Sequence, residues 1–167
     1  MKNIPDILQA LAKAEVKFVI VGGFAVQLHG FVRSTIDLDI VLAMDDSNLS
    51  SFIAVAKRFD LAPVVPAAIE ALKNSELIDR WFHEKGMVAF ALREPQPAGS
   101  VIDILVRPVV AFEALLSDSL SVELFGNSVN IASLDHLMAM KRVASRPKDL
   151  IDIDALEKIK RGIDPNV

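Results

Sequence analysis

The sequence of 167 residues contains no cysteine and only three histidines. Disulfide bonds and thiolate metal sites are therefore excluded, which is compatible with the cytoplasm, and no histidine has metal-ligand spacing. No apolar run reaches the roughly eighteen residues of a membrane span. The opening residues, Met1–Asp6, lack the apolar core of a signal peptide. We therefore expect a cytoplasmic protein that does not enter the membrane.

The composition indicates one globular domain. The length suits a single domain over 1–167, with a core at about 1–131 and a helical pair at about 132–161. The net charge of −4 argues against a broad, non-specific nucleic-acid surface. Hydrophobic residues make up 52% of the chain without forming a membrane span. This favours an exposed apolar face that binds a second copy of the chain, as a homodimer, or another protein.

The periodicity of the apolar residues predicts an α/β (α+β) fold, with a small, mixed, twisted sheet and helices largely on one face. The last two helices should close a cleft. The stretch 74–85 has no clear period. Helices are expected at 4–14, 24–29, 49–59, 66–73, 109–116, 132–145 and 146–161, and strands at 18–21, 37–41, 61–65, 86–92, 100–106, 121–125 and 128–131.

The stretch 18–41 organises the chain. Its first four residues, Phe18–Val21, form the short apolar run of a covered strand. Gly22 and Gly23 end this strand where the backbone must turn tightly or let a ligand come close. A short helix follows at once. A strand, a Gly-Gly turn and a helix N-terminus leave backbone N–H groups free for phosphate, although such a pair is often only a turn.

Two aspartates alternate with apolar residues in the next strand. Because successive side chains point to opposite faces, Asp37 and Asp39 share one face. A later apolar strand has Asp103 at its centre, and a buried charge there needs a partner or a metal. If the two strands are neighbours, Asp103 lies about 5 Å from Asp37 or Asp39. Three such carboxylates can hold two divalent ions about 3.5–4 Å apart, whereas the alternative is merely a polar strand face.

The loop between the two motif halves offers two further candidates. Arg33 can neutralise a phosphate oxygen or pair with one of the two aspartates, or it is an exposed loop residue. Thr35 can hydrogen-bond within the turn or reach a ligand. The sequence leaves these alternatives open.

The C-terminal helices contain a basic cluster in an acidic protein. Lys141 lies on the apolar stripe of its helix, where a lysine needs an anionic partner. Asp149 and Asp152 are three residues apart and share a helix face. We expect them to pair with Arg146 or Arg142 rather than to bind a metal. The alternative for the basic residues is simple stabilisation of a helix C-terminus.

The combined pattern resembles the nucleotidyltransferase superfamily, the polymerase-beta-like fold. Its elements are Gly22-Gly23, thirteen intervening residues, Asp37-Leu38-Asp39 and the later Asp103. Together with the run 133–153, the pattern looks most like the small bacterial AbiEii-type nucleotidyltransferases, several of which are toxins of toxin–antitoxin pairs. Gly23 stands where many members have serine.

This resemblance implies a metal-dependent transfer of a nucleoside monophosphate from an NTP to an acceptor, which is RNA or tRNA, a protein or a small molecule. It implies Mg²⁺, as two ions, or Mn²⁺, held by Asp37, Asp39 and Asp103, and an antitoxin partner. It also implies that Lys141 faces the triphosphate, and that Arg146 and Asp149 tie the last two helices together. The alternative is a non-catalytic module of the same fold that binds a nucleotide or a protein. A magnesium-dependent phosphohydrolase fits less well, because the first strand ends in glycine rather than aspartate.

Overall fold

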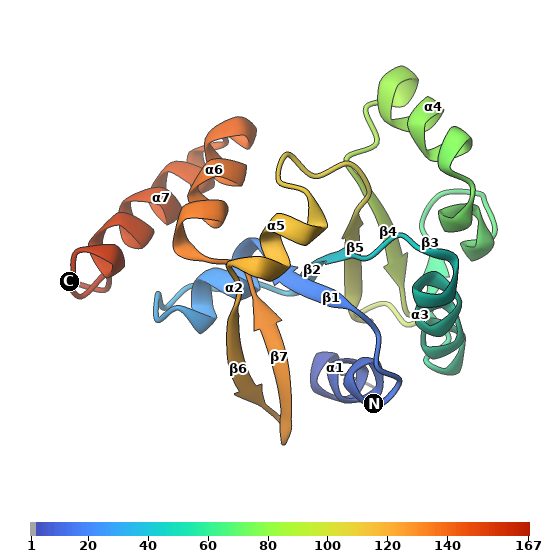
Figure 1. The fold of residues 1–167 in the computed structure, drawn as a ribbon, viewed down its shortest axis with the longest axis horizontal. Helices are drawn as coiled ribbons and strands as arrows, with labels where there is room; N and C mark the ends of the chain where they lie inside the picture. The colour runs from blue at the N-terminus through green and yellow to red at the C-terminus, as the bar shows by residue number, and fades with distance from the viewer. Residues whose placement is uncertain (1–2) are drawn as a thin grey trace.

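The computed structural model describes residues 3–167 as one mixed sheet with helices packed against it (Figure 1). Within these residues the sheet has the strand order β3-β4-β5-β2-β1-β7-β6. Strands β2 and β5 are parallel, as are β1 and β7, and the other neighbours are antiparallel. The strands are β1 Phe18–Val21, β2 Asp37–Leu42, β3 Ala62–Pro63, β4 Ala89–Arg93, β5 Val101–Leu105, β6 Leu120–Leu124 and β7 Asn127–Ile131.

Four helices within residues 3–167 begin after a residue whose side chain caps them. The side chain of Asp45 accepts the backbone N–H of Asn48, as expected of an N-cap. Ser133 caps the next-to-last helix in the same way, through the N–H of His136. The helices are α1 Ile4–Lys13, α2 Gly22–Leu28, α3 Asp46–Arg58, the 3₁₀-helix η1 Ile69–Lys73, α4 Ser75–Lys85, α5 Phe112–Ser117, α6 Leu134–Ala144 and α7 Pro147–Lys160.

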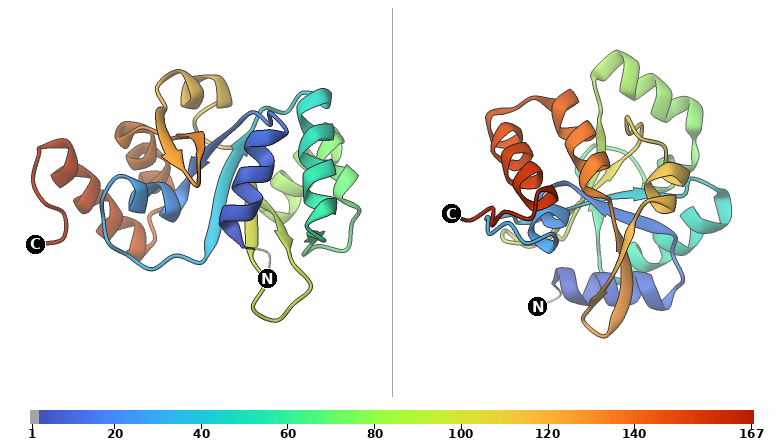
Figure 2. Two further views of the ribbon diagram at one scale, coloured as in Figure 1. Left: turned by 90° about the horizontal axis from the view of Figure 1, so that it is seen from below. Right: turned by 60° about the vertical axis from the view of Figure 1, so that its left-hand side comes forward.

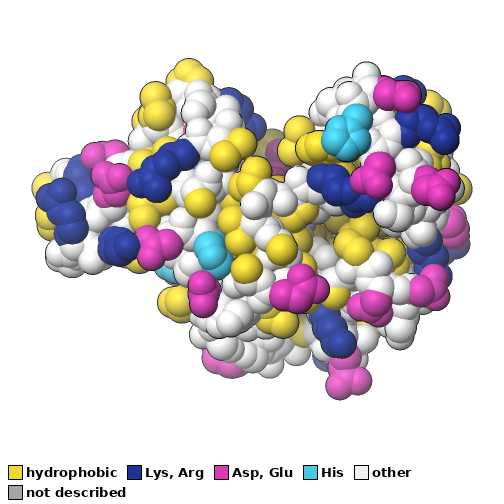
Figure 3. Space-filling model, turned by 45° about the horizontal axis from the view of Figure 1, so that its top comes forward, with side chains coloured by type: hydrophobic (Ala, Val, Ile, Leu, Met, Phe, Trp, Pro, Cys, Tyr) yellow, Lys and Arg dark blue, Asp and Glu magenta, His cyan; other side chains and the backbone are white. Residues whose placement is uncertain are grey.

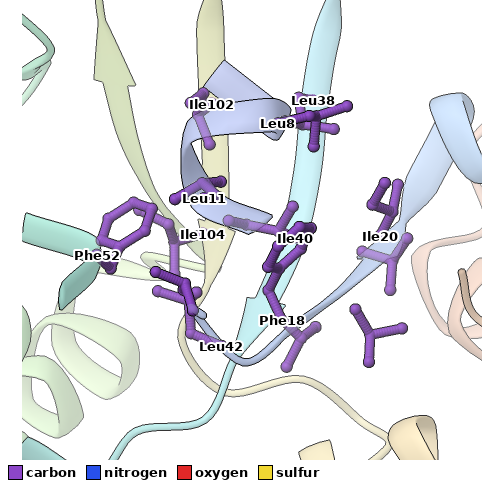
Figure 4. Close-up of a cluster of buried hydrophobic side chains, with 14 of the residues drawn as sticks. Leu8, Leu11, Phe18, Ile20, Leu38, Ile40, Leu42, Phe52, Ile102 and Ile104 are labelled. Atoms are coloured by element: carbon purple, nitrogen blue, oxygen red, sulfur yellow. The ribbon is translucent and has the colours of Figure 1, made fainter. Parts of the chain in front are cut away.

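The core lies between one face of the sheet and the helices α1 and α3. Figure 4 shows Leu8 and Leu11 of α1 and Phe52 of α3 beside the apolar residues of β2 and β5. Leu38 and Ile104, from these two strands, are both fully buried. Burying a side chain of this size stabilises the fold by about 1.5–3 kcal/mol. This face anchors the strands, so that their opposite face is free to form a site.

The C-terminal pair α6 and α7 packs together on a different side of the molecule from α1, as the two views of Figure 2 show. None of the helices within residues 3–167 combines the length and apolarity needed to cross a membrane.

The predicted fold class is confirmed, and β4–β5 and β6–β7 each form an antiparallel hairpin. Two local expectations need correction. The helix expected at 109–116 begins only at Phe112, because the preceding Ala111 is extended and serves as its N-cap. The helix expected at 66–73 is a 3₁₀-helix that begins at Ile69. The stretch 74–85, which lacked a clear period, forms α4 and ends at Gly86 in the left-handed conformation.

Candidate active site

The three predicted carboxylates lie on one face of neighbouring strands. Asp39 of β2 is the direct partner of Asp103 in the parallel ladder with β5. Alternation along β2 places Asp37 on the same face, and all three side chains are half-buried. Strands β2 and β5 are therefore neighbours, which the sequence analysis had to assume.

The Gly-Gly turn lies directly against this acidic group. Val21, the last residue of β1, pairs with Asp39 across the antiparallel ladder. A Cβ atom added at Gly22 would lie 2.0 Å from Oδ2 of Asp39, and Gly22 has a φ of +64°. The backbone N–H of Gly23 interacts with the same carboxylate. Position 22 therefore needs glycine both for its conformation and for the close approach of the acid.

A cavity of about 630 Å³ opens above the carboxylates. Figure 3 shows the molecule hollowed between the part formed by α6 and α7 and the part formed by α4. The lining of the cavity also includes apolar residues, among them Val88, Val109 and Val143. All ten residues that the sequence indicates as site residues line this cavity, namely Gly22, Gly23, Arg33, Thr35, Asp37, Asp39, Asp103, Lys141, Arg146 and Asp149.

The crowded carboxylates perturb one another. Burial, followed by repulsion from Asp103 and Asp37, raises the pKa of Asp39 to about 6, although the Gly23 N–H and Lys141 act in the opposite direction. Burial and repulsion from Asp37 also raise the pKa of Asp103. The site therefore holds more negative charge than its surroundings neutralise.

The donor set fits a hard divalent cation, which prefers carboxylate oxygens. The raised pKa of Asp39 also favours a cation at this site, because a cation would relieve the repulsion from Asp103 and Asp37. In their present positions, however, no three His, Asp or Glu side chains within residues 3–167 form a ready-made metal-binding group. The three aspartates would have to draw together around an ion.

Lys141 has the anionic partner that its apolar position requires. Its Nζ lies 2.7 Å from Oδ2 of Asp152 and 3.6 Å from Oδ1 of Asp149. Arg33 donates a hydrogen bond to the same Oδ2 of Asp152, and its side chain is only 18% exposed. Arg33 thus neither pairs with Asp37 or Asp39 nor lies exposed. Asp152 pairs with Arg33 and Lys141 rather than with Arg146 or Arg142.

Arg146 and Asp149 are paired, but within one helix. The backbone N and Nε of Arg146 donate to Oδ2 of Asp149 at 3.0 and 2.7 Å, which closes the N-terminus of α7. Lys141 joins the two helices through Asp149 and Asp152 of α7. Two further ion pairs join them, Arg142–Glu157 at 3.3 Å and Asp135–Lys160 at 2.6 Å. Of the two residues expected to tie the helices together, Asp149 contacts α6 through Lys141, whereas Arg146 donates hydrogen bonds to Asp149.

Thr35 and Arg33 occupy the space beside Gly23. A Cβ atom at Gly23 would lie 3.0 Å from Oγ1 of Thr35 and 3.1 Å from Cζ of Arg33. Thr35 also donates a hydrogen bond to the carbonyl of Asp37 at 3.4 Å, as expected for a turn residue. A serine at position 23 would have to displace these two side chains.

The sequence did not indicate three charged residues of the cavity, Arg107, Lys148 and Asp152, as site residues. Arg107 lies just after β5 and pairs with Asp79 of α4 at 2.6 Å. The sequence contained one indication that Asp152 belongs to the site, because Lys141 needs an anionic partner. Nothing local in the sequence indicated Arg107.

Residues 6–167 match the family model described as "Nucleotidyl transferase AbiEii toxin, Type IV TA system". A search among curated proteins finds no match. Among solved structures, the chain is similar to the crystal structure of an antigenic nucleotidyltransferase-like protein from Paracoccidioides brasiliensis. The identity is 19% and the TM-score is 0.53, over 92% of this chain and 72% of the other. At this identity the structural likeness shows the fold alone.

Proposed function

This chain belongs to the AbiEii nucleotidyltransferase family, and on that premise we propose that it transfers a nucleoside monophosphate from a nucleoside triphosphate to an acceptor hydroxyl or phosphate. The observation that best supports this is the register that sets Asp39 beside Asp103, with Gly22 against the same carboxylate. Carboxylates beside a Gly-Gly turn suit a metal–triphosphate complex.

In the proposed reaction, an acceptor oxygen attacks the α-phosphorus and forms a new P–O bond. The bond from the α-phosphorus to the bridging oxygen breaks, and pyrophosphate leaves with its electron pair. Where the acceptor is a hydroxyl, Asp103 accepts its proton. Burial and the neighbouring Asp37 raise the pKa of Asp103, which makes it a stronger base than an ordinary aspartate.

We propose Mg²⁺, as two ions, with Mn²⁺ as a substitute, held by Asp37, Asp39 and Asp103. Bound there, the cation would lower the pKa of the attacking hydroxyl and neutralise charge on the triphosphate. The chain's own contribution is a rigid pair of strands that presents all three carboxylates to one cavity.

The phosphates would lie between the Gly-Gly turn and the C-terminal helices. Gly22 and Gly23 would cradle the phosphates, and Arg33 and Lys141 would supply positive charge. Lys141 lowers the pKa of Asp39, so its charge acts on the acidic group directly. The same charge would offset negative charge that builds up on the leaving pyrophosphate.

The family description names a toxin of a toxin–antitoxin system. We propose the same role for this chain in the cytoplasm, with an antitoxin as partner and an RNA, a tRNA or a protein as acceptor.

The test is a transfer assay. The purified protein is mixed in turn with each α-labelled nucleoside triphosphate, Mg²⁺ and total cellular RNA and protein. Asp39→Asn is the inactive variant, and Asp154→Asn, an exposed aspartate of α7 paired only with Lys158 at 3.2 Å, is the matched control. We expect label on a macromolecule with the wild type and with Asp154→Asn, but not with Asp39→Asn.

A second outcome would separate activity from binding. Mg²⁺-dependent nucleotide binding without any transfer, lost in Asp39→Asn, would support the binding-module alternative. If neither binding nor transfer were detected with any of the four nucleotides, the proposed function would be wrong.

A further inference from the structure

Asp152 lies at the centre of a buried group of charges that joins three parts of the chain. Its side chain is only 3% exposed. Oδ2 accepts a hydrogen bond from Arg33, in the loop between α2 and β2, and lies 2.7 Å from Nζ of Lys141 on α6. Asp152 itself belongs to α7. One carboxylate oxygen therefore fixes two cations from distant segments, and both of these cations line the cavity.

The neighbouring Asp149 cannot take over this role. Its Oδ2 is engaged by two donors of Arg146, at 2.7 and 3.0 Å. Its Oδ1 lies 3.6 Å from Lys141, which is farther than the contact that Asp152 makes. Lys141 is only 7% exposed, so water is a poor substitute for the lost partner. The position of the Lys141 ammonium thus depends mainly on Asp152.

We propose that Asp152 is a positioning residue for the transfer reaction, which holds Lys141 and Arg33 in place around the phosphates. The inference rests on the proposed function. Asp152 contacts no reacting atom, and it acts through the two cations that it holds.

The positioning role can be distinguished experimentally from a purely structural one, because Asp152 also neutralises part of the positive charge of Arg33 and Lys141. Around the loop at Arg33 and the last two helices, the cavity has four cations, Arg33, Lys141, Arg146 and Lys148, against Asp149 and Asp152. Asparagine at position 152 would leave this group with one more unit of positive charge. A triphosphate should then bind more tightly, while Lys141 would no longer be held where charge develops in the transition state. A residue that only stabilised the fold would weaken both binding and transfer.

The experiment compares Asp152→Asn with Asp154→Asn, which removes the same charge from an exposed position on the same helix. Binding of each nucleoside triphosphate with Mg²⁺ is measured by calorimetry, and transfer by the labelled assay. We expect Asp152→Asn to bind roughly tenfold more tightly and to transfer at least roughly tenfold more slowly. Asp154→Asn should leave both values within about twofold of the wild type.

A measurement without nucleotide tests the positioning itself. Lysine side chains are acetylated under mild conditions and the modified sites are found by mass spectrometry. Lys141, buried and paired, should be among the least reactive lysines of the wild type and of Asp154→Asn. In Asp152→Asn its reactivity should rise at least roughly fivefold, because the amine loses its nearest partner.

Circular dichroism shows whether Asp152→Asn folds. If it does not, Asp152→Glu takes its place: with the charge kept but shifted by one methylene, nucleotide binding should stay within about twofold while transfer falls. Unchanged Lys141 reactivity and unchanged transfer in a folded Asp152→Asn protein would overturn the positioning role. If the wild type neither binds nor transfers a nucleotide, the proposed function fails, whereas the acetylation result still decides whether Asp152 holds Lys141.

Discussion

Asp39 and Asp103 face each other in the parallel ladder of β2 and β5, so two acidic side chains occupy adjacent places on one partly covered face. Their repulsion, added to burial, keeps the pKa of Asp39 at about 6. Such a pair opposes folding. Groups whose pKa is shifted by burial and by a like charge, and which line a cavity, are typical of functional sites.

Replacing Asp39 with asparagine should stabilise the metal-free protein at neutral pH. The pKa of Asp39 rises from 3.8 to about 6 on folding, because of burial first and then Asp103 and Asp37. Between these values the folded state keeps a proton that the unfolded chain has released. The free energy of unfolding therefore falls by about 3 kcal/mol as pH rises from about 4 to about 6, and asparagine avoids this loss.

Urea unfolding with EDTA measures the effect at about pH 7.5 and about pH 4. The variant should be the more stable protein at the higher pH, and the two proteins should converge at the lower one. A variant less stable than the wild type at about pH 7.5 would contradict the prediction.

Divalent cations should stabilise the wild type but not Asp39→Asn. A ligand that binds only the folded state adds about 2.7 kcal/mol at a concentration one hundred times its Kd. Thermal unfolding with Mg²⁺ or Mn²⁺ should therefore give a Tm that rises with cation concentration. Asp154→Asn should respond like the wild type, because Asp154 does not line the cavity. An equal rise in Tm in all three proteins would mean that the cation binds outside the carboxylate site.

Substituting alanine for Gly22 should cost more than backbone strain alone. Gly22 and Gly86 have nearly the same φ, +64° and +63°, but an added Cβ meets Asp39 at position 22 and nothing within 4 Å at position 86. Gly86→Ala should therefore cost about 1–2 kcal/mol, the usual strain of a left-handed residue. Gly22→Ala should cost more and also displace the Asp39 carboxylate.

Chemical denaturation of the two variants separates these effects, because Gly86→Ala supplies the strain without the clash. Only Gly22→Ala should lose nucleotide transfer. Equal costs in stability, together with equal activity, would mean that Asp39 moves aside freely.

Asp149→Asn should destabilise the protein in a pH-dependent way. Burial acts to raise the pKa of Asp149, but the side-chain and backbone hydrogen bonds of Arg146 outweigh it, so the pKa is lowered on folding. The stabilisation by this carboxylate is complete above the unfolded pKa of about 4 and is lost as pH falls further. We expect a loss of about 2 kcal/mol at neutral pH, which shrinks below about pH 4. Guanidinium unfolding across this range gives the difference, and a pH-independent loss would point to packing instead.

Patterns over a few neighbouring residues were enough to predict most of the strands and the residues that line the cavity. Alternation in Asp37-Leu38-Asp39 predicts a shared acidic face whatever the surrounding fold, because side chains of a strand alternate by geometry. The approximate positions of most helices were predicted as well, because the helical spacing of apolar residues is also a local pattern. Helix α4 was not, because its one fully buried residue, Ile78, leaves too weak an apolar stripe to recognise.

The sequence by itself therefore determined which residues carry charge, which faces are apolar, and that Lys141 needs an anionic partner. Only the tertiary structure decided that β5 lies beside β2, that the partner of Lys141 is Asp152, and that Arg33 shares it. The reason is physical. Alternation, capping and helical spacing act over a few residues, whereas strand order and ion pairs between distant segments depend on how the whole core packs. Arg33 and Asp152, 119 positions apart in the chain, meet only because α7 folds back over the loop that follows α2.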